Sequence, residues 1–156
     1  MSSLVRSGGA NIMMPFILVY GFYIVVHGHL TPPGGGFQGG AVIATAVVLL
    51  MVAYSRAEVR ASVSKNVLKN SETLGLLLFI GTALLALTAG LAFFGNWLLD
   101  AGTLFGTPVA FGINPPGDIN TGGIIPVLNI AVGIEVLGAM GILLLAMLGG
   151  MKGDAE

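Results

Sequence analysis

The residue with the clearest potential for chemistry is Glu135, an acid in the middle of a long apolar stretch over residues 122–150. A charged side chain at the centre of a bilayer costs roughly 3 kcal/mol on insertion scales, so such residues usually mark proton or ion pathways. Ala131, Gly138 and Ala139 lie at i−4, i+3 and i+4 from it and would let another helix approach closely. We interpret Glu135 as part of a proton or cation relay, or as half of an ion pair between subunits. The alternative is a protonated acid that makes a packing hydrogen bond.

His27, near the end of the first apolar stretch, is a second candidate for ion translocation. Tyr20, Tyr23 and His27 are spaced by three and four residues, so they share one stripe of a helix. This stripe could pass protons, although we favour an aromatic belt at the membrane interface with His27 as its polar anchor. His29 would point away from His27 on a helix, and two histidines are too few for a closed zinc site. The chain has no cysteine and no cofactor motif, so we expect no metal and no cofactor.

Asn129 is a third candidate, on the same predicted helix as Glu135. Six residues of helix separate the two side chains by about 120° around the axis, so they do not share a face. We therefore favour a hydrogen bond from Asn129 to another helix over a role as an ion ligand.

A glycine-rich run follows the first apolar stretch. It is not a phosphate-binding loop, because no Gly-Lys-Ser/Thr sequence follows it. Two membrane spans must reverse direction here within a few residues, and glycine permits both positive φ angles and close backbone contact. We predict a tight turn that packs against neighbouring helices, with little prospect of a catalytic role. The residues of this structural motif are His29, Pro33, Gly34, Gly35, Gly36, Phe37, Gly39 and Gly40.

The composition of the whole chain indicates an integral membrane protein. Charged residues make up 8% of the 156 residues, against roughly 25% in a typical soluble domain, and hydrophobic residues make up 55%. A soluble domain or a disordered chain is therefore excluded. Nucleic acid is excluded as a partner because there are six lysines and arginines and a net charge of −1. The lipid bilayer is the expected surrounding.

Four apolar stretches are long enough to cross a bilayer of roughly 30 Å as helices, so the sequence predicts an all-α, multi-pass protein with one membrane domain over residues 1–156. We expect the helices at about 12–30, 37–55, 73–95 and 122–150, with Asn70 or Ser71 as the cap of the third.

The distribution of lysine and arginine predicts the orientation. Four of the six basic residues lie in the connection 56–72, and the other two, Arg6 and Lys152, lie outside the first and last spans. Four spans put all six on one side, so the positive-inside rule predicts that both termini and the connection 56–72 are cytoplasmic. Val59, Val63 and Val67 repeat every four residues within this connection and indicate a short amphipathic helix on the membrane surface.

The run from His27 to Gly40, HGHLTPPGGGFQGG, resembles the motif of the B subunit of multisubunit, Mrp- or Mnh-type cation/proton antiporters. The family pattern has an aspartate early in the last span, where this chain has Asn129, and the acid here is Glu135. The run Ile125–Asn129 is more similar to homologues in ion-pumping respiratory complexes, such as archaeal membrane-bound hydrogenases and sulfane sulfur reductases.

This resemblance implies an accessory, non-catalytic membrane subunit that assembles with other membrane subunits of an antiporter or of a complex I-like assembly in the cell membrane. Sodium ions and protons are the transported species it implies. The alternative is a purely structural scaffold in a stand-alone antiporter, with no direct part in ion movement.

The orientation can be tested by single-cysteine labelling, because the chain has no native cysteine. In intact cells, a membrane-impermeant thiol reagent should fail to label Lys65→Cys. It should label Asp118→Cys, which lies between the third and fourth predicted spans. Labelling of Lys65→Cys from outside would contradict the predicted orientation.

Overall fold

The structure, a computed structural model, describes residues 5–28, 34–98 and 122–150, and the regular secondary structure of these residues is helical. The elements are a π-helical segment η1 (Val5–Ile12) and the helices α1 (Met13–His27), α2 (Gly36–Ala53), α3 (Arg56–Ser62), α4 (Lys65–Thr88) and α6 (Ile125–Gly150).

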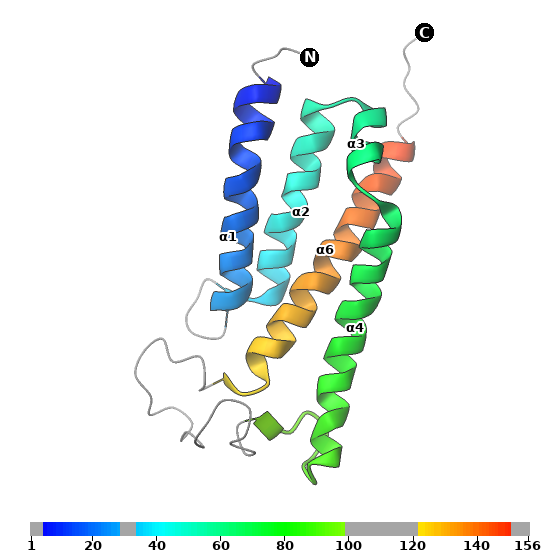
Figure 1. Ribbon diagram of the computed structural model, residues 1–156. Helices are drawn as coiled ribbons and strands as arrows, with labels where there is room; N and C mark the ends of the chain where they lie inside the picture. Colours follow the sequence, from blue (N-terminus) through cyan, green and yellow to red (C-terminus); the bar gives the residue numbers. More distant parts are fainter. Residues whose placement is uncertain (1–4, 29–33, 99–121, 151–156) are drawn as a thin grey trace.

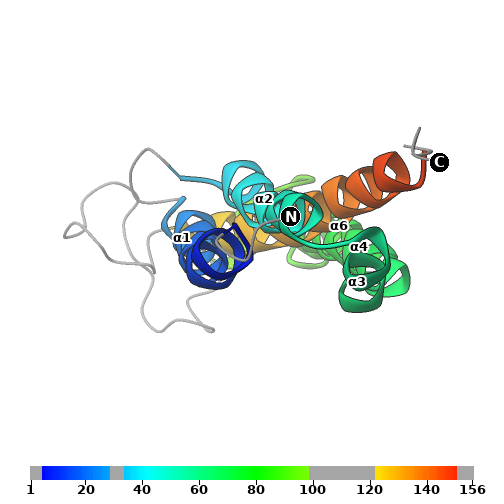
Figure 2. The ribbon, with the colours of Figure 1, turned by 90° about the horizontal axis from the view of Figure 1, so that it is seen from above.

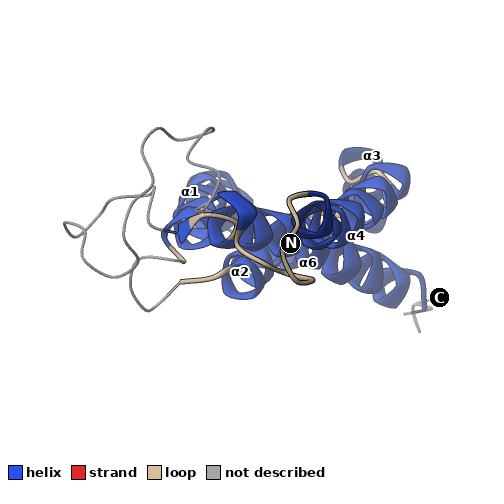
Figure 3. Ribbon diagram, turned by 90° about the horizontal axis from the view of Figure 1, so that it is seen from below, coloured by secondary structure: helices blue, strands red, loops and turns tan. Residues whose placement is uncertain are grey.

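Four of these helical stretches are long and apolar enough to cross a membrane, namely η1 with α1, then α2, α4 and α6. The predicted all-α membrane fold is therefore confirmed. The long helices lie side by side in the order α1, α2, α6 and α4, so the last helix of the chain lies between the second and third spans (Figure 1). Figures 2 and 3 show the same helices from above and from below.

Small residues fill the contacts within the row, and large apolar side chains point out of it. Ala44, Ala83 and Ala131 are at most 1% exposed, whereas Phe16 and Phe22 are each 66% exposed. In the most apolar window of α4, 22% of the residues are buried. The row therefore presents broad apolar surfaces that require lipid or other membrane proteins.

The third span begins and ends earlier than the range 73–95 that we predicted, because α4 runs from Lys65 to Thr88. Its N-cap is Ser64 rather than Asn70 or Ser71, and it ends before Gly90, which has a φ of +77°. Apolar residues mark the part of a helix that lies in lipid. The mostly polar residues 65–72 extend the same helix out of the lipid.

The amphipathic helix predicted through Val59, Val63 and Val67 is shorter than expected. Helix α3 begins with a capping box, in which the Ser55 amide donates to Glu58 Oε2 at 2.8 Å, and it ends at Ser62. Val59 is buried at 1% exposure, but Val67 lies on α4 and is 65% exposed. The helical repeat of valines therefore spans two helices with a break at Val63 and Ser64. The start of η1, the end of α6 and all of α3 lie at the same end of the long helices, the upper end in Figure 1. We call it the basic end of the row, because α3 and the first turns of α4 carry Arg56, Arg60, Lys65 and Lys69.

The turn between α1 and α2 brings glycine backbones into direct contact. A Cβ added at Gly28 would collide with the backbone of Gly35, and one added at Gly34 would lie 2.5 Å from the Cα of Gly28. The Gly35 amide donates to the Ile24 carbonyl at 3.2 Å, and Gly35 has a φ of 148°, which favours glycine. The predicted motif residues His29 and Pro33 lie outside the described residues.

The first turns of α2 pack directly on α6. A Cβ added at Gly36 would collide with the carbonyl oxygen of Asn129, and one at Gly40 would lie 2.7 Å from the carbonyl oxygen of Gly133. Gly39 makes a similar contact with α1, at 2.7 Å from the carbonyl oxygen of Gly21. Phe37 differs from its glycine neighbours, because it is 62% exposed and points out of the row.

Side chains beyond the end of α4 fix the start of α6. Asn96 Oδ1 accepts a hydrogen bond from the Ile124 amide at 2.9 Å, and the Trp97 indole donates to the Thr82 carbonyl at 3.1 Å. The first bond joins the segment after the third span to the entry of the fourth, and the second ties that segment back to α4.

We expect Gly36→Val to prevent assembly of the host complex, because its side chain would meet the backbone of α6. Overpacking costs about 1–3 kcal/mol in ordinary cores, and more where backbone must move. Gly8→Val is the matched control, since a Cβ at Gly8 meets no atom within 4 Å. Blue-native electrophoresis of detergent-solubilised membranes measures assembly. Normal assembly of Gly36→Val together with lost transport would contradict the packing role.

Candidate functional site

Glu135 lies on α6 at the contact with α4, a surface that we call the α4–α6 seam. It is half-buried, and the residue opposite it is Gly75. A Cβ added at Gly75 would lie 2.6 Å from the Glu135 amide nitrogen and 2.7 Å from the Glu135 Cβ. The two helix backbones therefore approach closely at Glu135. The Cβ of Glu135, from which its side chain extends, lies against α4.

The small residues around Glu135 allow this close approach, as their spacing in the sequence suggested. Ala131 is fully buried, and its carbonyl oxygen would lie 2.6 Å from a Cβ at Gly75. One turn beyond Glu135, a Cβ at Gly138 would lie 2.6 Å from both the Leu68 carbonyl oxygen and the Glu72 amide nitrogen. The approaching helix is α4 of the same chain.

Glu72 is a second acid on the α4–α6 seam that the sequence reasoning missed. The range 56–72 was predicted as a surface connection, but Glu72 lies within α4, is half-buried, and packs its backbone against Gly138. Gly138 and Glu135 are about one helical turn apart on α6. The seam therefore involves one acidic residue deep in the span and the backbone of another closer to the basic end of the row.

Gly75 is the other seam residue that the sequence reasoning missed, although a signal for it exists. The buried residues Leu68, Gly75 and Thr82 of α4 are spaced by seven, and so are Ala131 and Gly138 of α6. A seven-residue spacing keeps side chains on one seam between two helices. Such a spacing indicates which sides of α4 and α6 form the seam, while the position of Gly75 opposite Glu135 comes from the contacts in the structure.

Asn129 lies on a different side of α6 from Glu135, facing the start of α2 at Gly36. Its side-chain nitrogen is buried and has no hydrogen-bond partner among the residues that the structure describes. The interhelical hydrogen bond that we predicted therefore does not form within the described part of the chain. The structure does not bring Asn129 and Glu135 together.

His27 lies at the end of α1 and continues a ladder of aromatic rings. The ring centroids of Tyr23 and His27 are 4.9 Å apart, and those of Tyr20 and Tyr23 are 6.5 Å apart, in stacked arrangements. Both tyrosines are more than half exposed. The α4–α6 seam lies on the far side of α6 from α1, so the aromatic ladder that ends at His27 lies away from Glu135 in the row (Figure 1).

The α4–α6 seam can exchange protons or bind a cation transiently, but it has few ligands. No group of three or more histidine, aspartate or glutamate residues that could hold a metal ion exists among residues 5–28, 34–98 and 122–150. A carboxyl group in a packed seam can accept and release a proton or contact a monovalent cation.

Residues 7–142 match the family of domains related to the MnhB subunit of Na⁺/H⁺ antiporters. An uncharacterised protein of Methanocaldococcus jannaschii is 40% identical over 129 residues, which cover 82% of this chain and 45% of that protein. A Na⁺/H⁺ antiporter subunit of Bacillus subtilis is 34% identical over 65 residues, covering 42% of this chain and 45% of that one. The chain therefore spans about half the length of these curated relatives.

A solved structure has the same arrangement of helices. A chain in the structure of the membrane-bound sulfane sulfur reductase, described as an archaeal respiratory membrane complex, matches with a TM-score of 0.69 and 31% sequence identity. The match covers 94% of this chain and 58% of the other.

We expect Gly75→Ala to separate α4 from α6 at Glu135, because its methyl group would meet backbone atoms at 2.6 Å. The matched control is Gly81→Ala on the same helix, where an added Cβ meets nothing within 4 Å. Limited proteolysis of the purified complex should show faster cleavage between the third and fourth spans in Gly75→Ala alone. Equal resistance of the two variants to the protease would contradict the close backbone contact of α4 with α6 at Gly75.

Proposed function

This chain belongs to the family of domains related to the MnhB subunit of Na⁺/H⁺ antiporters, and from that membership we propose that it is an accessory, non-catalytic subunit of a cation/proton translocation module. Its partners are other membrane subunits of an Mrp-type antiporter or of a complex I-like assembly. The ions are sodium and protons. The host is a larger ion-pumping respiratory complex of the hydrogenase or sulfane sulfur reductase type, in keeping with the solved structure that it resembles.

The open row of helices supports a role within a larger assembly. A lone transporter needs two gates around a central site, and known folds often build these from internal repeats. Here each helix contacts its neighbours in the row, and the large apolar side chains of α1 and α4 point outward. Adjacent subunits would cover part of this surface and lipid the remainder.

The basic end of the row supports a cytoplasmic location for both termini. Arg56 and Arg60 lie on α3, and Lys65 and Lys69 lie on the first turns of α4. The start of η1 and the end of α6 lie at this same end (Figure 1). The positive-inside rule assigns such an end to the cytoplasm.

The observation that carries a direct role in ion movement is the position of Glu135 on the α4–α6 seam. The acid costs several kcal/mol to place in lipid if charged, and a packed seam reduces its contact with lipid. Glu72 lies about one turn nearer the basic end, so it is a second acidic residue close to the proposed path. His27 and Asn129 remain further candidates elsewhere in the row.

A structural scaffold without a direct role is the second candidate function. The glycine contacts that build the turn and the α4–α6 seam favour it, because they serve packing whether or not Glu135 exchanges a proton. The two functions differ in what removal of the titratable group does to an assembled complex.

We expect Glu135→Gln to leave the complex assembled but to lower cation-dependent proton movement by about ten-fold or more, since removing a proton-exchanging group costs at least that much in many enzymes. Glutamine keeps the size and hydrogen bonding of glutamate but cannot titrate. Glu135→Asp should retain part of the activity. The measurement is proton movement in vesicles that hold equal amounts of assembled complex.

Glu58→Gln is the matched control for this substitution. It makes the same chemical change on α3, and glutamine also serves as the third residue of a capping box. We expect it to transport ions as the wild type does. Full transport by Glu135→Gln would instead favour the scaffold.

A further inference from the structure

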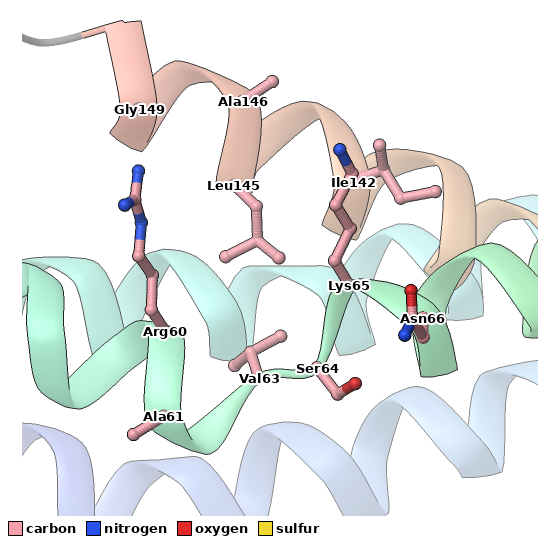
Figure 4. A pocket seen from close by; sticks show the side chains of 10 residues that line it. All are labelled: Arg60, Ala61, Val63, Ser64, Lys65, Asn66, Ile142, Leu145, Ala146 and Gly149. Carbon is pink, nitrogen blue, oxygen red and sulfur yellow. The ribbon is translucent and has the colours of Figure 1, made fainter.

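A cavity of about 670 Å³ opens where α3 gives way to α4 and the last turns of α6 pass over this break. Its walls carry two cationic side chains, Arg60 and Lys65, and its floor includes Val63 and Leu145 (Figure 4). No acidic side chain is among its lining residues within the described ranges 5–28, 34–98 and 122–150. The cavity is therefore positively charged and partly apolar, and it is distinct from the α4–α6 seam at Glu135.

The two cations lie on either side of the apolar floor. Figure 4 shows Arg60 extending from α3 toward Gly149 and Lys65 extending from α4 toward Ile142, with Leu145 directed toward Val63 between them. A Cβ added at Gly149 would lie 3.2 Å from Arg60 Nη2, so the guanidinium group reaches the last turn of α6. The space between the two cations has the charge to receive an anion.

Nearby acids are engaged elsewhere. The Glu58 carboxylate accepts from the Ser55 amide at the start of α3 and lines a different, mostly apolar cavity. Glu72 packs its backbone at the α4–α6 seam. Neither acid lines the cavity between Arg60 and Lys65.

The position of Lys65 at the start of α4 makes the binding of an anion in the cavity more favourable. Lys65 is the first residue of α4, where the helix dipole is least favourable for a cation. The first turn of α4 has no acidic residue, and Ser64 forms no side-chain cap. A bound anion would compensate the dipole and the lysine together, in addition to Arg60.

The apolar floor and its place at the end of the spans define what kind of anion fits. Ile142 and Leu145 belong to the apolar span of α6, so the cavity lies where hydrocarbon gives way to lipid headgroups. A soluble anion would leave these side chains without a partner, whereas an amphiphile would use both halves of the cavity. Basic pockets between spans at this depth bind anionic lipid headgroups.

We propose that this cavity is a binding site for an anionic phospholipid. The phosphate lies between Arg60 and Lys65, and the first carbons of the acyl chains lie against Ile142 and Leu145. The lipid fixes the α3–α4 break against the end of α6. This site is independent of the proposed ion path, so failure of one proposal leaves the other intact.

The test uses the whole complex, purified in mild detergent and reconstituted with photoactivatable phosphatidylglycerol or photoactivatable phosphatidylcholine. After illumination, mass spectrometry locates lipid adducts on the peptides that contain residues 60–66 and 142–149. We expect phosphatidylglycerol to label these peptides about ten-fold more than zwitterionic phosphatidylcholine, since each basic residue near the surface favours anionic lipid. Equal labelling by the two lipids in the wild-type complex would overturn the proposal.

A pair of double variants separates this cavity from general surface charge. Arg60→Gln/Lys65→Gln should reduce phosphatidylglycerol labelling to the phosphatidylcholine level. Arg56→Gln/Lys69→Gln removes the same charge at the same end of the row but outside the cavity, and should label as the wild type does. Equal losses in both would show unspecific attraction and would overturn the site.

Two further experiments, with inorganic phosphate and with a chemical cross-linker, test for other occupants of the cavity. Millimolar inorganic phosphate should not displace the lipid label, and displacement would identify a site for free anions. A chemical cross-linker that joins Lys65 to acidic residues 154 or 156, or to another protein of the complex, with no lipid adduct would identify a protein occupant. Either result would contradict the lipid proposal.

Discussion

Direct contact between helix backbones at glycine is the constraint on which the row of helices depends. In lipid, apolar side chains gain little by leaving one apolar surrounding for another, so association of helices depends on close packing and polar contacts. At Gly36, Gly40, Gly75 and Gly138, an added Cβ would meet backbone atoms of the adjacent helix at 2.7 Å or less. The same contacts set which residues face one another, and they bring α4 onto Glu135.

The row explains why an acid can lie within the apolar span of α6. Close contact with α4 at Gly75 gives Glu135 a protein neighbour instead of lipid on that side. A second acid, Glu72, follows about one turn nearer the basic end. The outer faces of the row remain apolar, so the acid depends on this seam and on whatever subunits cover the row. Packing and chemistry therefore depend on the same glycine residues.

Much of this fold could be read from the sequence, because the length of each apolar stretch and the density of glycine report directly on spans and turns. The start of α4 at Lys65 could not be read in this way, since apolarity ends at the membrane surface and helices do not. Glu72 was placed in a connection for the same reason. The pairing of Gly75 with Glu135 could not be read either, since a seven-residue spacing marks the seam side of each helix but not which residues lie opposite one another. The Asn129 side-chain nitrogen has no hydrogen-bond partner among the described residues. Its partner depends on what surrounds α6, which the sequence of one chain does not contain.

We propose that Glu135 gains and loses a proton on the α4–α6 seam. Infrared difference spectroscopy of the assembled complex tests it most directly, with sodium added and removed at constant pH. The account predicts a change in the carbonyl stretching band of a protonated carboxyl group that is present in the wild type and absent in Glu135→Gln. A difference spectrum that is identical in the wild type and in Glu135→Gln would contradict it.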